Sequence, residues 1–337
     1  MENPLLNVKN LKTYFFTTAG VVKAVDNVSF DLKKGEALGL AGESGCGKTT
    51  TAYSIMRLVP HPGKIVDGHI YFNGDDLVQK TEDEMRKIRW KKISIIFQGA
   101  MNALNPVFTV GDQIIEAIQL HEDVSKEEAE ERASKLFEMV GLSPSRLFDY
   151  PHEFSGGMRQ RAMIAMALAC NPELVIADEP TTALDVSIQV QILNLLRDLK
   201  EQFDLSLIVI THDLSIIAEL ADRVAIMYAG KIVEISDVIS MYHKPVHPYA
   251  FALIKSVPDI ESAKTKKLYS IPGNPPNLIN PPSGCRFHPR CPFAKPICKQ
   301  EEPLIKEIDK GRLVACHFAE DIMSMEIEEI GEKFEGL

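Results

Sequence analysis

Residues 42–49 combine the residue types that can hold a phosphate group. The segment reads Gly-Glu-Ser-Gly-Cys-Gly-Lys-Thr and fits the pattern G-x-x-x-x-G-K-S/T. It follows an apolar run at 36–41, which predicts a strand, and precedes a helix-forming run at 50–58. The backbone amides of the loop and the N-terminus of the helix would then point at the same anion. The alternative, a glycine-rich turn that binds nothing, would need neither the strand before it nor the helix after it. The residues predicted to contact a nucleotide are Gly42, Ser44, Gly45, Cys46, Gly47, Lys48, Thr49 and Thr50; Lys48 would bridge the β- and γ-phosphates and Thr49 would ligate Mg²⁺.

A second apolar run, at 174–177, ends in the two carboxylates Asp178 and Glu179. A buried strand would deliver Asp178 to the Mg²⁺ shell from a rigid position. Glu179 would then polarise the attacking water as general base. Acidic residues at strand ends are also common on protein surfaces, so this run alone would be weak evidence for a catalytic site. It becomes strong evidence because the same chain contains residues 42–49. Together the two segments predict hydrolysis of a magnesium–nucleotide complex.

A second anion site is predicted at Phe154-Ser-Gly-Gly-Met158, which precedes a helical run. Ser155, Gly156 and Gly157 would present amides at a helix N-terminus to a γ-phosphate. The segment resembles the signature motif of ABC ATPases, with Phe154 for the usual Leu and Met158 for the usual Gln. This resemblance implies that the signature of one cassette completes the phosphate loop of another, so that ATP is held between two copies of the fold.

The other ABC motifs follow in order. Gln98 resembles the Q-loop glutamine that senses Mg²⁺ and water, Asp185 in Ala-Leu-Asp resembles the D-loop, and His212 resembles the switch histidine at the γ-phosphate. The resemblance also implies that Phe15, or less favourably Tyr14, is the aromatic residue that stacks on adenine, although an aromatic residue there could equally cap the core. The resemblance covers residues 5 to about 235. A small GTPase or nucleotide kinase would account for residues 42–49 but not for the signature, Gln98 or His212.

The elements that must position these residues are short apolar strands alternating with helices. The runs 174–177 and 205–210 are of the kind buried in a parallel sheet, and 224–228 with 231–235 form a predicted hairpin turning at Ala229-Gly230. We predict an α/β protein with the ABC nucleotide-binding fold: a P-loop, RecA-like core with an antiparallel β subdomain and a helical insert. A small, irregular, metal-binding extension would follow. The predicted domains are an ATP-binding core at 1–98 and 160–235, a helical signature subdomain at 99–159 and a C-terminal extension at 236–337.

Composition limits the function classes. The 337 residues carry a net charge of −10, which argues against a broad nucleic-acid surface because phosphate binding depends on Lys and Arg. No apolar run is long enough to span a bilayer, and the first twelve residues lack the apolar core of a secretory signal. We therefore expect a cytosolic protein that binds no nucleic acid.

The C-terminal part narrows the resemblance. His243-Lys-Pro-Val-His-Pro-Tyr249 and Cys285-Arg-Phe-His-Pro-Arg-Cys291 closely resemble the ATPases of oligopeptide and dipeptide importers. That resemblance implies a peripheral protein at the cytoplasmic face of the cell membrane. Its partners would be two permease subunits, a related but non-identical ATPase (or a second copy), and an extracellular peptide-binding protein acting indirectly. Segment 98–106 and the helical insert would bind a coupling helix of the permease. Alternatives are import of nickel chelates or short oligosaccharides, or a soluble ABC ATPase with no membrane partner.

Four cysteines cluster near the end of the chain: Cys285, Cys291, Cys298 and Cys316. Four thiolates can hold a [4Fe–4S] cluster or a tetrahedral Zn²⁺. The spacings lack the tight C-x2–4-C knuckles of zinc sites, so we favour [4Fe–4S], as the resemblance to some dipeptide-importer ATPases also implies. Disulfides or free thiols are a third reading. His288 and His317 are possible substitute ligands. Such a centre would brace a proline-rich segment that lacks its own core, or sense oxygen or iron.

Overall fold

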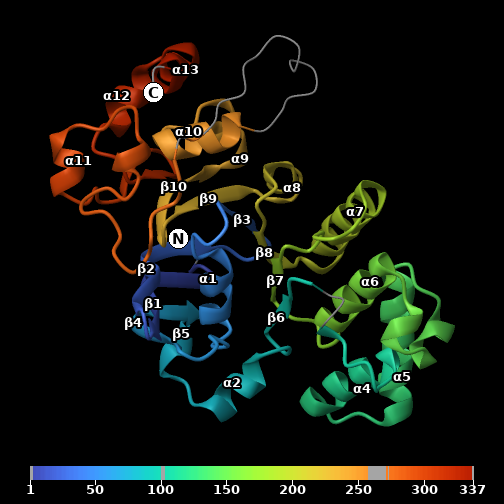
Figure 1. Cartoon of the computed structure of the whole chain (residues 1–337). Helices are drawn as coiled ribbons and strands as arrows, with labels where there is room; N and C mark the ends of the chain where they lie inside the picture. Colours follow the sequence, from blue (N-terminus) through green and yellow to red (C-terminus); the bar gives the residue numbers. More distant parts are fainter. Residues whose placement is uncertain (1–2, 100–102, 257–270, 272, 336–337) are drawn as a thin grey trace. The chain divides into compact units, whose positions relative to one another are not determined.

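The structure of the chain is a computed structural model that describes residues 3–99, 103–256, 271 and 273–335 (Figure 1). Contacts divide it into two compact units. Unit one comprises residues 1–6, 32–37 and 71–211, and unit two comprises residues 7–31, 38–70 and 212–337. Part of the predicted permease-binding segment, 100–102, lies outside the described residues. Within the described part of the chain, no helix combines the length and apolar character needed to cross a bilayer.

Unit one is built on three parallel strands, β6 (Ile93–Ile96), β7 (Leu174–Asp178) and β8 (Ser206–Ile210). The register places Ile176 of β7 opposite Ile95 of β6 and Ile208 of β8. Every residue of these strands is buried, which explains why their sequences are continuous apolar runs rather than alternating ones. The predicted strands at 174–177 and 205–210 are therefore confirmed.

The helices of unit one begin where their sequences supply caps. The Thr81 and Ser125 hydroxyls each accept a hydrogen bond from the backbone amide of the glutamate three residues later. The carboxylate of that glutamate accepts one from the backbone amide of the capping residue, which forms a capping box. The principal helices are α2 (Glu82–Ile88), α4 (Val110–His121), α5 (Lys126–Met139), α6 (Gly156–Ala167) and α7 (Val186–Phe203), with short 3-10 turns η2 (Pro144–Phe148) and η3 (Pro151–Glu153).

Unit two contains two sheets. In one, β2 (Gly20–Leu32), β1 (Leu6–Thr17) and β4 (Gly63–Phe72) lie side by side in that order. In the other, β3 (Ala37–Ala41) pairs in parallel with β9 (Arg223–Tyr228), and β9 pairs with β10 (Lys231–Asp237) as an antiparallel hairpin. The hairpin turns through Ala229 and Gly230, whose φ values are 49° and 83°, as the sequence predicted.

The C-terminal extension is more regular than the sequence suggested. After the last proline, β11 (Lys306–Asp309) and β12 (Arg312–Val314) form a hairpin, and β12 pairs with the free edge of β10. A buried cluster of apolar side chains under α9 (Val238–His243) and α10 (Pro248–Lys255) includes Tyr228, Tyr249 and Phe287. The extension is therefore held by strand pairing and an aromatic core. Its other elements are α11 (Pro296–Gln300), α12 (Ala319–Ser324) and α13 (Ile327–Glu335).

Candidate active site

The phosphate loop, residues 42–48, connects β3 to α1 (Lys48–Ile55) in unit two. Gly42 and Gly47 have φ values of 151° and 110°, in the region that favours glycine. A Cβ on Gly42 would lie 2.1 Å from the carbonyl oxygen of Met227, and one on Gly47 would lie 2.2 Å from that of Ala24. These two positions therefore exclude any side chain, which explains the glycines of the motif.

Lys48 lies across the loop it belongs to. Its ammonium donates hydrogen bonds to the carbonyl oxygens of Gly42 (2.7 Å) and Glu43 (3.1 Å). Gly47 caps α1 without any side-chain hydrogen bond, and the first turn of α1 contains no acidic residue. Because the first amides of a helix need acceptors, this helix start and the nearby ammonium suit a phosphate.

The carboxylates follow β7 in unit one. Asp178 is fully buried at the end of the strand. Glu179 has a φ of 48°, and its amide donates to the carbonyl of Ile210 at 2.7 Å. This left-handed backbone is uncommon for a glutamate, and such strain is often found at active sites.

Gln98 and Glu179 are 81 residues apart in the sequence and meet in the structure. The Gln98 side-chain amide donates to one Glu179 carboxylate oxygen at 2.8 Å, and the Thr182 hydroxyl donates to the same oxygen at 2.8 Å. Carboxylate and amide oxygens are the donors that Mg²⁺ prefers. Asp178 and Gln98 therefore fit a Mg²⁺ shell by their chemistry, and the Gln98 and Thr182 donors fix the position of the Glu179 carboxylate.

The signature residues begin a helix as predicted. Ser155 caps α6 by accepting the amide of Met158 at 3.3 Å, and no acidic residue stands in the first turn. A Cβ on Gly157 would lie 2.8 Å from the Ile188 side chain of α7, which explains this glycine by packing. Asp185 caps α7, accepting from the Ile188 amide and the Ser187 hydroxyl, and these bonds lower its pKa. Asp185 therefore has a structural role whatever else it contacts.

The predicted site residues fall in both units. Lys48, Thr49, His212 and the aromatic residues of β1 belong to unit two, whereas Gln98, Ser155, Asp178, Glu179 and Asp185 belong to unit one. The side chain of His212 is exposed. The nucleotide-binding and catalytic roles of these residues remain predictions.

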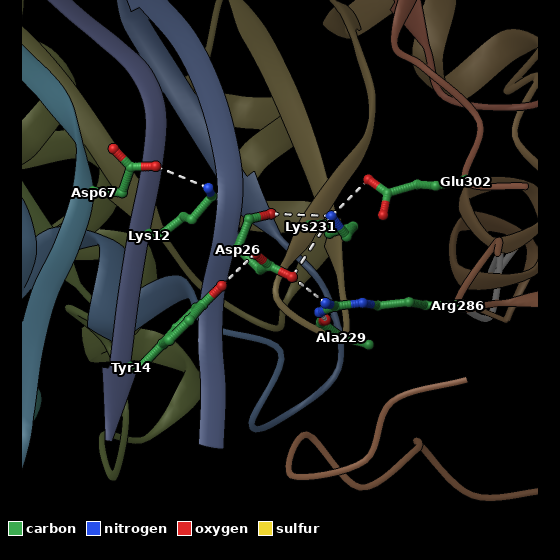
Figure 2. Close-up of polar contacts among 8 residues, drawn as sticks. All are labelled: Lys12, Tyr14, Asp26, Asp67, Ala229, Lys231, Arg286 and Glu302. Atoms are coloured by element: carbon green, nitrogen blue, oxygen red, sulfur yellow. Dashed lines mark hydrogen bonds and ion pairs between the residues drawn. The ribbon is translucent and has the colours of Figure 1, made fainter. Parts of the chain in front are cut away.

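Tyr14 and Phe15 lie on opposite faces of β1, since successive side chains of a strand alternate. The Tyr14 hydroxyl donates to the Asp26 carboxylate at 2.7 Å (Figure 2), and burial together with this bond raises the pKa of Tyr14. Phe15 is half-buried beside Gly63, where an added Cβ would lie 2.7 Å from its ring. The fixed position of Tyr14 favours Phe15 as the adenine-stacking residue.

The C-terminal cysteines gather around one small cavity. Cys285, Cys291, Cys298 and Cys316 all line it, and all are free thiols. The amides two residues beyond Cys285, Cys291 and Cys316 each donate a hydrogen bond to the sulfur, and burial raises the pKa of these three thiols.

The predicted metal centre is not supported by this arrangement. Among the described residues, no group of three or more His, Cys, Asp or Glu side chains is placed to hold a metal ion. The two histidines considered as substitutes contact backbone carbonyls instead: His288 lies 2.9 Å from that of Cys285 and His317 lies 3.0 Å from that of Glu301. Burial raises the pKa of the Cys285, Cys291 and Cys316 thiols, whereas metal ligation requires thiolates.

Sequence reasoning missed one contact of the phosphate loop. The Glu43 carboxylate is paired with Arg290, 247 residues further along the chain. No local pattern predicts a pair at this separation. The one indication in the sequence that Arg290 has a specific role was its position inside the Cys285–Cys291 motif.

The chain is similar to known proteins along most of its length. Residues 25–182 match the family model of ABC transporters, and residues 233–298 match that of the oligopeptide/dipeptide transporter C-terminal region. The oligopeptide transport ATP-binding protein OppD of Escherichia coli is 48% identical over 93% of this chain and 92% of its own. The dipeptide transport ATP-binding protein DppD of the same organism is 44% identical over 94% and 97%.

Solved structures agree on the fold. The dimeric, post-hydrolysis structure of the ATP-binding cassette MJ0796 bound to ADP and Pi superposes with a TM-score of 0.63. It is 30% identical to this chain, covering 69% of it and 98% of its own length. The predicted ABC nucleotide-binding fold is thereby confirmed. The chain is an ABC-type ATPase and belongs to the family of ATP-binding proteins of oligopeptide/dipeptide ABC transporters.

Proposed function

We propose that this protein hydrolyses ATP held between two cassettes and thereby drives the import of dipeptides or oligopeptides through a membrane permease. The observation that carries the hydrolytic part is the Gln98–Glu179 contact beside the buried Asp178. The phosphate loop supplies Lys48 and Thr49, Phe15 stacks on adenine, and His212 contacts the γ-phosphate. Ser155 to Gly157 complete the site of the facing cassette, and Asp185 lies at the interface between the two cassettes. When bound, Mg²⁺ neutralises phosphate charge, and Thr49, Asp178 and Gln98 would hold it.

Peptide import is favoured by the similarity of residues 233–298 to the C-terminal region of peptide transporters. The proposed assembly is peripheral, at the cytoplasmic face of the membrane. It has two permease subunits, a related second ATPase or another copy of this chain, and an extracellular peptide-binding protein. Reconstitution of that assembly in vesicles tests the proposal: peptides should stimulate ATP hydrolysis, whereas stimulation by nickel chelates or oligosaccharides would assign the alternative substrates. Failure to bind any permease would leave a soluble ATPase.

An exposed apolar patch of unit one is the proposed permease contact. Val107, Phe108, Phe148 and Tyr150 are 70%, 53%, 65% and 41% exposed. The Val110 amide donates to the Asp149 carbonyl at 3.0 Å, which brings the two segments carrying these side chains together. Exposed apolar side chains gathered in this way are typical of protein-binding surfaces.

Replacing both aromatic residues of the patch, Phe108→Ser with Phe148→Ser, should reduce peptide uptake by reconstituted vesicles about tenfold or more. The isolated ATPase should keep its ATP turnover, because neither residue belongs to the proposed ATP site. Ile239→Ser on α9, which replaces a residue 72% exposed, is the matched control and should leave uptake unchanged. Normal uptake by the double variant would contradict this assignment.

A second proposal concerns the four cysteines. We propose that they draw together around their shared cavity to hold a [4Fe–4S] cluster, with Zn²⁺ as the alternative, and that this centre braces the extension. The amide hydrogen bonds to three of the sulfurs favour this, since such bonds stabilise thiolates.

Protein purified without oxygen should contain about four iron and four sulfide per chain and absorb broadly near 400 nm. Cys298→Ser should lower the iron content strongly, while Cys170→Ser, which changes a buried cysteine of unit one, should not. One zinc per chain and no colour would assign the alternative. Absence of both metals would overturn the proposal and leave these cysteines as free thiols.

A further inference from the structure

Arg290 of the C-terminal extension contacts the phosphate loop directly. Its guanidinium forms two hydrogen bonds with the Glu43 carboxylate, at 2.8 and 3.0 Å. The side chain of Arg290 is only 6% exposed and that of Glu43 is 24% exposed. Paired donors of a planar guanidinium fix both the position and the orientation of a carboxylate. Glu43, the second residue of the loop, therefore has a fixed side chain.

Tyr249 fixes the backbone of the same residue. The Glu43 amide donates to the Tyr249 hydroxyl at 2.8 Å, and Tyr249 is fully buried. Its ring lies 4.5 Å from the ring of Tyr228, and the Arg290 guanidinium lies over Tyr228 at 5.7 Å, measured to the ring centre. Arg290 and Tyr249 thus form one rigid group, the loop clamp, which is anchored in the aromatic core of the extension.

The clamp acts on the part of the loop that positions Lys48. The Glu43 carbonyl accepts hydrogen bonds from the Lys48 ammonium (3.1 Å) and the Cys46 amide (3.3 Å). Any movement of Glu43 would therefore shift two groups that the motif aims at phosphate. A free carboxylate on this loop would also repel a triphosphate, and Arg290 neutralises that charge.

Arg290 is connected to a second anchor. Arg286, in the same segment between Cys285 and Cys291, donates to the Asp26 carboxylate and to the Ala229 carbonyl (Figure 2). The Lys231 ammonium contacts Asp26 of β2 and donates a hydrogen bond to the Glu302 carboxylate. It is therefore a second link between the β1–β2 sheet and the extension. The segment that bears the clamp arginine is thus held at both ends.

We propose that Arg290 and Tyr249 are positioning residues for ATP binding: through Glu43 they hold the phosphate loop in its binding geometry, so that the extension sets the affinity for ATP. This inference rests on the proposed role of residues 42–49 as the ATP site. Coupling between two parts of a protein is reciprocal, so ATP must in turn stabilise the clamp segment.

Arg290→Met should raise the Kd for ATP about tenfold, within the range typical of such coupling. KM for ATP should rise similarly, whereas kcat at saturating ATP should stay within about twofold, because the clamp touches no reacting atom. Adding Glu43→Gln to Arg290→Met should recover much of the affinity, since the unneutralised carboxylate is removed. Tyr249→Phe removes a single buried oxygen and should raise the Kd about threefold to fivefold, by the same coupling.

Two controls separate positioning from general destabilisation. Tyr242→Phe removes the hydroxyl of a partly buried tyrosine of unit two, which donates to the Leu214 carbonyl, and should leave the Kd unchanged. Arg312→Lys weakens a buried ion pair of the extension that does not touch the loop, and should also leave the Kd unchanged. Equal Kd values for Arg290→Met, Tyr249→Phe and wild type would overturn the proposal, and so would an equal loss in the controls.

Hydrogen exchange supplies a readout independent of turnover. The amides of Cys285, His288 and Arg290 are hydrogen-bonded, and their exchange should slow when ATP binds the wild type. Arg290→Met should abolish this response. A response that persists in the variant would overturn the coupling, whereas a wild type that binds no ATP would refute the proposed ATP site instead.

Discussion

Glu179→Gln is expected to slow ATP hydrolysis by about 10²–10⁴-fold, the usual contribution of a general base, while ATP binding is retained. The substitution keeps the size of the side chain and an oxygen that can accept from Gln98 and Thr182, both of which lie 2.8 Å from the carboxylate. What is lost is the basic carboxylate, because an amide does not take a proton from water at neutral pH. The loop geometry, including the left-handed backbone at position 179, should survive.

The same variant should accumulate as an ATP-bound dimer, because the proposed site lies between two cassettes and opens after hydrolysis. Size-exclusion chromatography with and without Mg-ATP measures this directly, and a phosphate-release assay measures turnover. Glu173→Gln is the matched control, since Glu173 precedes the start of β7 and pairs with Lys92. It should behave as wild type within about twofold. A Glu179→Gln protein that hydrolyses ATP normally and stays monomeric would exclude Glu179 as the base.

The parts of the site that the sequence predicted are those encoded by contiguous residues. The phosphate loop and β7 could be placed because a motif or an apolar run coincided with a buried strand, and Gly42 and Gly47 are explained by close backbone contacts. The Gln98–Glu179 contact is different in kind. Its residues are 81 positions apart, and only resemblance to a family assigned them to one site.

Long-range pairs and edge pairing could not be predicted. The Arg290–Glu43 and Arg312–Glu234 pairs join residues 247 and 78 positions apart, and each residue alone reads as an ordinary surface charge. The hairpin of β11 and β12 was missed because prolines dominate the segment before it. Its pairing depends on the free edge of β10, which a one-dimensional pattern does not reveal.

The cysteine prediction shows where spacing stops being informative. Spacing suggested that the four thiols converge, and they do line one cavity. Spacing could not tell whether the sulfurs approach as ligands, since that depends on burial and on the backbone amides around them. Folding the segment onto an aromatic core already explains part of its order, so the extension does not depend on a metal for all of its contacts.

Arg312→Met should reduce the free energy of unfolding of the extension by about 3–5 kcal/mol, the usual cost of removing one partner of a buried ion pair. Glu234 on β10 is fully buried, and its carboxylate accepts two bonds from the Arg312 guanidinium, at 2.8 and 3.1 Å. It also accepts the amides of Val246 and His247. Without Arg312, the buried carboxylate would keep these two backbone donors but lose its charged partner.

The loss of stability caused by Arg312→Met should depend on pH. Burial raises the pKa of Glu234 even beside Arg312, and removing the arginine must raise it further. A carboxyl group whose pKa is higher in the folded state than in the unfolded state, where it is about 4.3, stabilises the folded state at pH values below about 4.3. This stabilisation is lost as the pH rises through the folded-state pKa. The difference between Arg312→Met and wild type should therefore be largest at neutral pH and shrink toward pH 4–5.

Hydrogen exchange at the β10–β12 pairing, for example at the Ala315 amide that donates to Val233, reports on this unit without requiring two-state unfolding of the whole chain. The double variant Glu234→Gln with Arg312→Met should recover most of the stability, because Gln still accepts both amides and carries no charge. A pH-independent loss below about 1 kcal/mol in Arg312→Met would show that the pair contributes little. In that case strand pairing and the aromatic core alone would hold the extension, and with it the loop clamp, against the phosphate loop.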